Sequence, residues 1–106
     1  MTIVKPPVSG SFTSTGASDG VRVSGKCNVT LSFSGAGVVA LERSFDGVIW
    51  AVVSKNNVPE KAEFTQDINT VVEEPEVGVF YRWNCVSYSS GSIAYRIGRS
   101  ELGHFN

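Results

Sequence analysis

Alternation of apolar and polar residues constrains the fold of this chain more than any other feature. Between positions 26 and 34 every second residue is apolar, and the pattern returns at positions 77–88 and 92–98. Successive side chains of a β-strand point to opposite faces, so each run predicts a strand with one buried face. Residues 48–54 are nearly all apolar, which predicts a strand that is covered on both faces or lies against a partner.

Turn signals separate these runs. They are Ser18-Asp19-Gly20, Ser34-Gly35-Ala36-Gly37, Asp46-Gly47 and Ser89-Ser90-Gly91. Short strands spaced roughly 8–12 residues apart are typical of antiparallel sandwiches and barrels. We therefore expect an all-β fold, an antiparallel β-sandwich of the jelly-roll or immunoglobulin-like kind. A helical stripe also fits part of residues 57–72, so one short helix or 3-10 turn is the alternative there.

The chain of 106 residues has the length of one domain. Consecutive prolines cannot be helical, so we expect residues 1–7 to form an extended arm. Residues 8–99 are expected to form the sandwich, and residues 100–106 a C-terminal tail.

Composition and charge exclude several classes of function. No apolar run approaches the roughly 18 residues of a membrane span, and residues 1–10 lack the apolar core of a secretory signal. The net charge of −1, with scattered basic residues, gives no electrostatic footprint for nucleic acid. We expect neither a membrane nor a nucleic acid as partner.

Ser44, Asp46, Gly47 and Trp50 form a Ser-x-Asp-Gly-x-x-Trp pattern. Asp-Gly between apolar runs is a strong hairpin signal, because both residues tolerate positive φ and Asp can accept hydrogen bonds from nearby backbone amides. The pattern resembles the Asp-box turns of sialidase-like propellers and the hairpins of discoidin-like sandwiches, where it is structural. We expect a hairpin with Trp50 lying over it, not a catalytic site.

The residues needed for common catalytic and metal sites are sparse. His104 is the only histidine, so neither a Ser–His–acid triad nor a histidine-based zinc site is expected. Cys27 and Cys85 lack C-x-x-C spacing, which leaves buried thiols or an inter-sheet disulfide, and the missing signal peptide favours free thiols.

The acidic segment Glu73-Glu74-Pro75-Glu76 has two interpretations. A glycosidase would need its carboxylates held across a cleft, and a cation bound here would be Ca²⁺. Three carboxylates in one proline-containing turn are more simply a solvated loop. We expect no catalytic residue, no metal and no cofactor.

Aromatic and arginine side chains are therefore the best binding candidates. Phe80, Arg82 and Tyr88 fall on the second face of the longest strand, and this composition is typical of interface hot spots. The same side chains could stack on sugar rings, or the strand could pass from the core to its rim. The candidate interface residues are Ile3, Val4, Pro6, Pro7, Trp50, Phe80, Arg82 and Tyr88.

Two segments, LERSFDGVIWAVVS and EEPEVGVFYRWNCVSYSSGSIAYRIG, together resemble small β-rich structural proteins of tailed bacteriophage virions. In that group an S-x-D-G-x-x-W hairpin precedes an acidic E-x-P-E turn, a G-V-x-Y-R strand ending in Cys, and an S-G hairpin leading to Y-R. The resemblance covers about residues 37–99 and omits the arm and the tail.

The resemblance implies a non-enzymatic role as a capsid decoration or cement protein on the virion exterior, assembled in the host bacterial cytoplasm. The implied partners are the major capsid protein and further copies of the chain, as a dimer or trimer, with no small-molecule ligand. A tail or neck component and a carbohydrate-binding sandwich module are the alternatives. An extended arm could add to the sheet edge of a neighbouring subunit.

Overall fold

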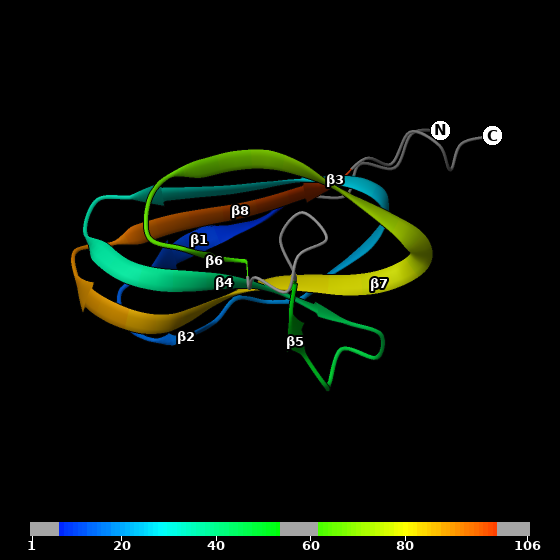
Figure 1. The fold of residues 1–106 in the computed structure, drawn as a ribbon, viewed down its shortest axis with the longest axis horizontal. Helices are drawn as coiled ribbons and strands as arrows, with labels where there is room; N and C mark the ends of the chain where they lie inside the picture. Colours follow the sequence, from blue (N-terminus) through cyan, green and yellow to red (C-terminus); the bar gives the residue numbers. More distant parts are fainter. Residues whose placement is uncertain (1–6, 54–61, 100–106) are drawn as a thin grey trace.

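The computed structural model describes residues 7–53 and 62–99, which form eight β-strands (Figure 1). The strands are β1 (Val8–Phe12), β2 (Gly16–Ala17), β3 (Val21–Phe33), β4 (Ala36–Ser44), β5 (Ala51–Val52), β6 (Glu63–Phe64), β7 (Ile68–Ser90) and β8 (Ile93–Arg99). The described residues contain no helix, so none that could cross a membrane. The helical alternative is therefore wrong for the described part of residues 57–72, which contributes to β6 and β7.

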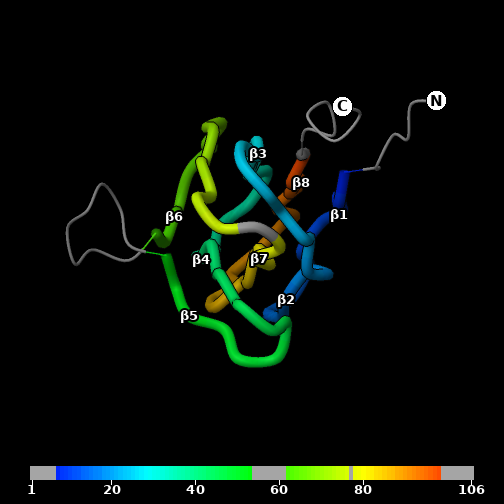
Figure 2. Tube along the Cα trace, turned by 90° about the vertical axis from the view of Figure 1, so that its right-hand side faces the viewer, coloured from blue at the N-terminus to red at the C-terminus, as the bar shows by residue number. Residues whose placement is uncertain are grey.

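Every strand pairing is antiparallel, which confirms the predicted all-β antiparallel class. The main path through the sheet is β1-β8-β3-β7-β4-β5, while β2 pairs with β7 and β6 pairs with β4. Seen from the side, β5 and β6 lie on one side of the molecule and β1 on the other (Figure 2). The long strands β3 and β7 connect these two sides.

A sharp bend in β7 lets this one strand serve both layers (Figure 1). Its first part, Ile68 to Glu74, pairs with Leu31 to Gly25 of β3. Its second part pairs with β4 from Phe80 to Ser90, while Val79 to Tyr81 also remains paired with β3. Between these parts the register jumps from Gly25↔Glu74 to Val23↔Val79. Gly78 lies in this irregular stretch with a φ of 77°, a conformation that side-chain-bearing residues rarely adopt. The bend thus folds one sheet into a sandwich-like shape.

The core lies between the two layers and follows the predicted alternation. Trp83 is fully buried, and the other core side chains pack around it. The largest fully buried residues are Trp83, Leu31, Ile93, Ile97, Val21, Val23, Val29 and Val39. Cys27 and Cys85 are buried free thiols, as predicted, and burial raises the pKa of Cys27 to about 11. Neither cysteine is poised to act as a nucleophile.

Tyr88 does not lie on the outer face, where the alternation placed it. β4 pairs Val39 with Cys85 but Val38 with Ser87, so Val86 is an extra residue on β7. A β-bulge of this kind reverses which face the following side chains occupy. Tyr88 consequently packs against the core, and its hydroxyl donates a 2.7 Å hydrogen bond to the Gly91 carbonyl.

The apolar run at 48–54 is also not covered on both faces. Among the described residues 48–53, only Ala51–Val52 forms a strand, β5, and it pairs with β4 at the edge of the sheet. Val48 and Ile49 lie in the preceding loop with 77% and 76% of their surfaces exposed. The apolar residues reflect a projecting loop and not a central strand.

Candidate functional site

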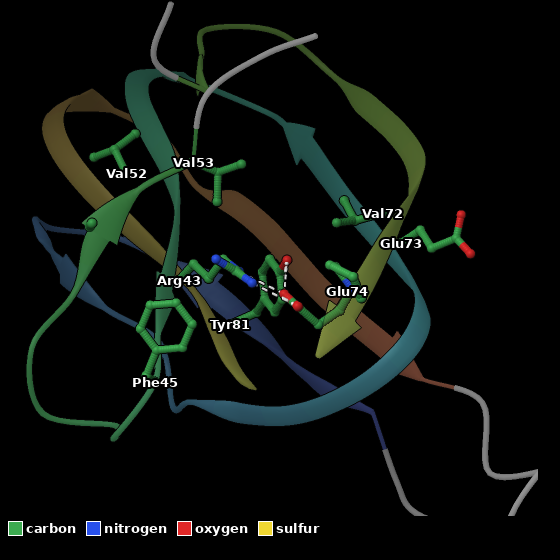
Figure 3. Close-up of a pocket in the computed structure, with 10 residues that line it drawn as sticks. Arg43, Phe45, Val52, Val53, Val72, Glu73, Glu74 and Tyr81 are labelled. Carbon is green, nitrogen blue, oxygen red and sulfur yellow. Dashed lines mark hydrogen bonds and ion pairs between the residues drawn. The ribbon is translucent and has the colours of Figure 1, made fainter. Parts of the chain in front are cut away.

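An open pocket of about 540 Å³ lies between β5 and the bend of β7 (Figure 3). Its apolar wall includes Val52 and Val53 on one side and Val72 on the other. Arg43 and Tyr81 extend toward Glu74 between these walls, from strands β4 and β7. The pocket therefore joins an apolar surface to a polar cluster.

The Glu74 carboxylate is the centre of this cluster, and both of its oxygens are fully engaged. Oε1 accepts from Arg43 Nε at 2.6 Å and from the Tyr81 hydroxyl at 2.8 Å. Oε2 accepts from Arg43 Nη2 at 2.7 Å and from the Glu76 amide at 2.8 Å. The Glu74 side chain is completely buried, and such a bidentate arginine pair with two further donors satisfies a buried carboxylate.

These contacts fix the charge states of the cluster. The hydrogen bonds from Arg43 outweigh desolvation and lower the pKa of Glu74 to about 2. Burial, together with the hydrogen bond to Glu74, raises the pKa of Tyr81 above its usual value, and the bond to Glu74 raises that of Arg43. At neutral pH Glu74 is a carboxylate whose lone pairs are already occupied, so the cluster ties β4 to the bend of β7 and offers no general base.

The acidic segment is thus divided between two environments. Glu73, Pro75 and Glu76 are exposed, as the solvated interpretation expects, but the segment lies within strand β7 and not in a loop, and Glu74 is buried. Glu76 lies 3.6 Å from Arg43, with 60% of its side chain exposed. Within residues 7–53 and 62–99 no group of three or more potential ligands could hold a metal ion.

The Ser-x-Asp-Gly-x-x-Trp segment joins β4 to β5, which confirms the predicted hairpin. Asp46 Oδ1 accepts from the backbone amides of Val48 at 2.8 Å and Ile49 at 2.9 Å. Ser44 Oγ accepts from the Gly47 amide at 2.8 Å and donates to Asp46 Oδ1 at 2.9 Å. These backbone bonds lower the pKa of Asp46, so the carboxylate remains ionised and holds the loop.

The tip of this hairpin presents an apolar surface to solvent. Phe45 is 68% exposed, and Val48 and Ile49 are more exposed still. We call Phe45, Val48 and Ile49 the hairpin tip. The backbone amides of Val48 and Ile49 are bonded within the loop, whereas their apolar side chains are exposed. Phe45 lies next to the pocket cluster, with its ring centroid 4.9 Å from the Arg43 guanidinium carbon.

Three of the predicted interface residues come together on the outer face of β4 and β7. The Arg82 guanidinium lies 4.3 Å from the Trp50 ring centroid, and its Nε donates to Glu42 at 2.7 Å. Phe80 and Trp50 both approach Gly20, at 3.9 Å and 3.1 Å from the position of a Cβ built there. Arg82 of β7 covers one face of the Trp50 ring, and the ring lies near Gly20. That Trp50 packs over its own hairpin stays a prediction.

The remaining candidate residues fall elsewhere. Pro7 is exposed immediately before β1, whereas Ile3, Val4 and Pro6 lie outside the described residues, as does His104. The sequence interpretation missed Arg43 and the hairpin tip. An arginine among apolar residues of a strand could have indicated a buried partner, but its Glu74 partner lies 31 residues away.

No family model matches this chain, and no curated protein or solved structure is similar to it.

Proposed function

We propose that this chain is a non-enzymatic structural protein of a virion, which decorates the capsid by binding the major capsid protein. The hairpin tip, Phe45, Val48 and Ile49, is the contact surface in this proposal. The observation that carries it is the combination of exposure and order in this loop: more than two thirds of each side chain is exposed, on a backbone held by Ser44 and Asp46.

A loop that is ordered before binding loses less conformational entropy when it docks. Contiguous exposed apolar side chains on a folded domain typically mark an interaction site. Phe45 adds an aromatic ring, the kind of side chain enriched at interface hot spots. These properties suit a rigid module that binds a repeating protein surface.

The virion setting rests on the sequence resemblance, which includes both the hairpin and the strand after the acidic turn. The polar cluster of Arg43, Glu74 and Tyr81 supports a structural role. The Glu74 carboxylate already accepts four hydrogen bonds, so it has no free lone pair with which to act on a substrate. Carbohydrate binding through Trp50 is less well supported, because Arg82 already occupies one face of that ring.

Co-sedimentation with purified capsids that lack the protein tests this proposal. We expect stoichiometric pelleting of the wild-type chain, and a V48S/I49S variant should bind about 10- to 100-fold more weakly because two anchor side chains are lost. Its thermal stability should change little, since both residues are exposed.

The matched control is V86S, because Val86 is also an exposed valine, at 44%, but lies on β7 and not in the hairpin. This variant should pellet as well as wild type. A wild-type chain that never pellets with capsids would contradict the decoration role, and equal pelleting of V48S/I49S would remove the hairpin tip from it. A glycan array tests the carbohydrate alternative, which saturable binding sensitive to W50A would favour.

A further inference from the structure

The first part of β7, residues 68–74, is an open edge of the sheet. Among the described residues its backbone pairs with β3 on one side and with no strand on the other. It borders the pocket, whose opposite wall is β5 (Figure 3). A free strand edge beside an apolar pocket can accept an added strand, because main-chain bonds supply affinity and the pocket selects a side chain.

The side chains along this edge of β7 would be matched by an added strand that has two consecutive apolar residues. Val71 is 60% exposed, whereas its neighbour Val72 is partly buried and lines the pocket. Figure 3 shows Glu73 pointing away from the pocket, on the opposite side of the strand from Val72. An added strand therefore meets an apolar position on each face and a carboxylate at the next position along the outer face.

Charge also distinguishes the strand that would fit. Residues 62–78 contain five acidic residues and no lysine or arginine. Arg43 pairs with Glu74 and lies 3.6 Å from Glu76, and Lys26 is the β3 residue opposite Glu73. Residues 1–7 of the chain, MTIVKPP, have the opposite character. They contain no acidic residue, and their two adjacent apolar residues, Ile3 and Val4, are followed directly by Lys5.

We propose that residues 2–5 of a second copy of the chain add as a parallel strand to this edge of β7. In this register Ile3 lies beside Val71, Val4 enters the pocket beside Val72, and Lys5 lies beside Glu73. Pro6 and Pro7 have no backbone N–H, so strand pairing ends where β7 itself turns. This inference does not depend on the capsid role.

The same chain cannot supply these residues. The registers Val8↔Ile97, Val29↔Ile97 and Val29↔Thr70 place the start of β1 three strands away from the β7 edge. Three inter-strand steps span about 14 Å. Lys5 is three residues before Val8 and reaches at most about 10 Å from it, so residues 2–5 cannot lie along their own edge. The strand must come from another copy.

Light scattering of the full chain across a concentration range is the first test. We expect self-association, and an I3D/V4D variant should dissociate at concentrations about 100-fold higher or remain monomeric. The control I3V/V4I keeps both residues apolar and β-branched and should associate like wild type. Thermal unfolding checks that every variant is folded.

A peptide of residues 1–8 tests strand addition directly, using folded I3D/V4D protein as its receptor. Unmodified peptide should bind saturably. One of two peptides, N-methylated at Thr2 and Val4 or at Ile3 and Lys5, should lose binding while the other keeps it, because alternate amides face the edge. Equal binding of both peptides would overturn strand addition.

A charge exchange tests the register. K5E and E73K should each weaken self-association about 3- to 10-fold, and the double variant should recover most of the loss. Failure to recover would contradict the Lys5–Glu73 alignment. A second outcome would also overturn the proposal. If the full chain is monomeric and the V71D variant no longer pellets with capsids, the β7 edge binds the capsid protein and not a second copy of the chain. The capsid role itself would then remain intact.

Discussion

The cluster of Arg43, Glu74 and Tyr81 joins β4 to β7, and the hairpin tip follows directly after the end of β4, yet these two regions use their side chains in opposite ways. In the cluster, the Glu74 carboxylate is buried and its two oxygens accept four hydrogen bonds. In the hairpin, the carboxylate of Asp46 satisfies the backbone, and apolar side chains remain in solvent.

We infer from this difference that the cluster contributes mainly to the stability of the fold and the hairpin tip mainly to binding. A buried carboxylate is tolerated only when donors replace its water, so the cluster depends on all of its members. Exposed apolar side chains contribute little to folding, but they contribute favourable free energy when a partner buries them. The predictions below test this separation, beginning with the largest expected effect.

Replacing Glu74 by glutamine should cost about 3–5 kcal/mol of unfolding free energy, because the change leaves Arg43 near the pocket without its carboxylate. Urea unfolding followed by tryptophan fluorescence measures this loss. The control is E76Q, which removes the exposed neighbouring carboxylate and should change stability by about 0.5 kcal/mol or less. Equal effects of the two variants would contradict the role of the cluster.

Low pH should also remove the contribution of ionised Glu74 to the free energy of unfolding. The pKa of Glu74 falls from its usual 4.5 to about 2 in the folded protein, so ionised Glu74 stabilises the fold above about pH 4.5. As the pH falls from 4.5 toward 2, about 3 kcal/mol should be lost. Unfolding curves across this range measure the slope, and E74Q should show a correspondingly shallower one. Parallel slopes for both proteins would be incompatible with a lowered pKa.

Loss of the Asp46 carboxylate should produce a smaller change in stability than loss of the Glu74 carboxylate. D46A removes the acceptor of two backbone amides in an exposed loop and should cost about 1 kcal/mol. Capsid binding should weaken about 5- to 10-fold, because the tip is less ordered before it docks. D19A, an aspartate in another exposed turn, serves as the control and should alter neither property.

Local patterns were sufficient to predict the class of fold and the hairpin. Alternation identified the buried faces of β3 and β7, and Asp46-Gly47 identified the connection of β4 to β5. These features are set by neighbouring residues, because side-chain direction alternates along a strand and turn chemistry is local.

Features that depend on distant partners were missed or misplaced. Glu74 resembles its solvated neighbours in sequence, and only the fold brings Arg43 to it. Tyr88 changed faces because a bulge at Val86 depends on pairing with β4. The apolar residues Val48 and Ile49 suggested a covered strand, because hydrophobicity alone does not distinguish a core position from an exposed binding surface.

Comparing E74Q and V48S/I49S in both unfolding and capsid co-sedimentation tests the central claim most directly. The two variants should separate the properties: E74Q should lose stability but still pellet at temperatures where it is folded, whereas V48S/I49S should keep its stability and lose capsid binding. Wild-type pelleting by V48S/I49S, or loss of pelleting by folded E74Q alone, would contradict the account.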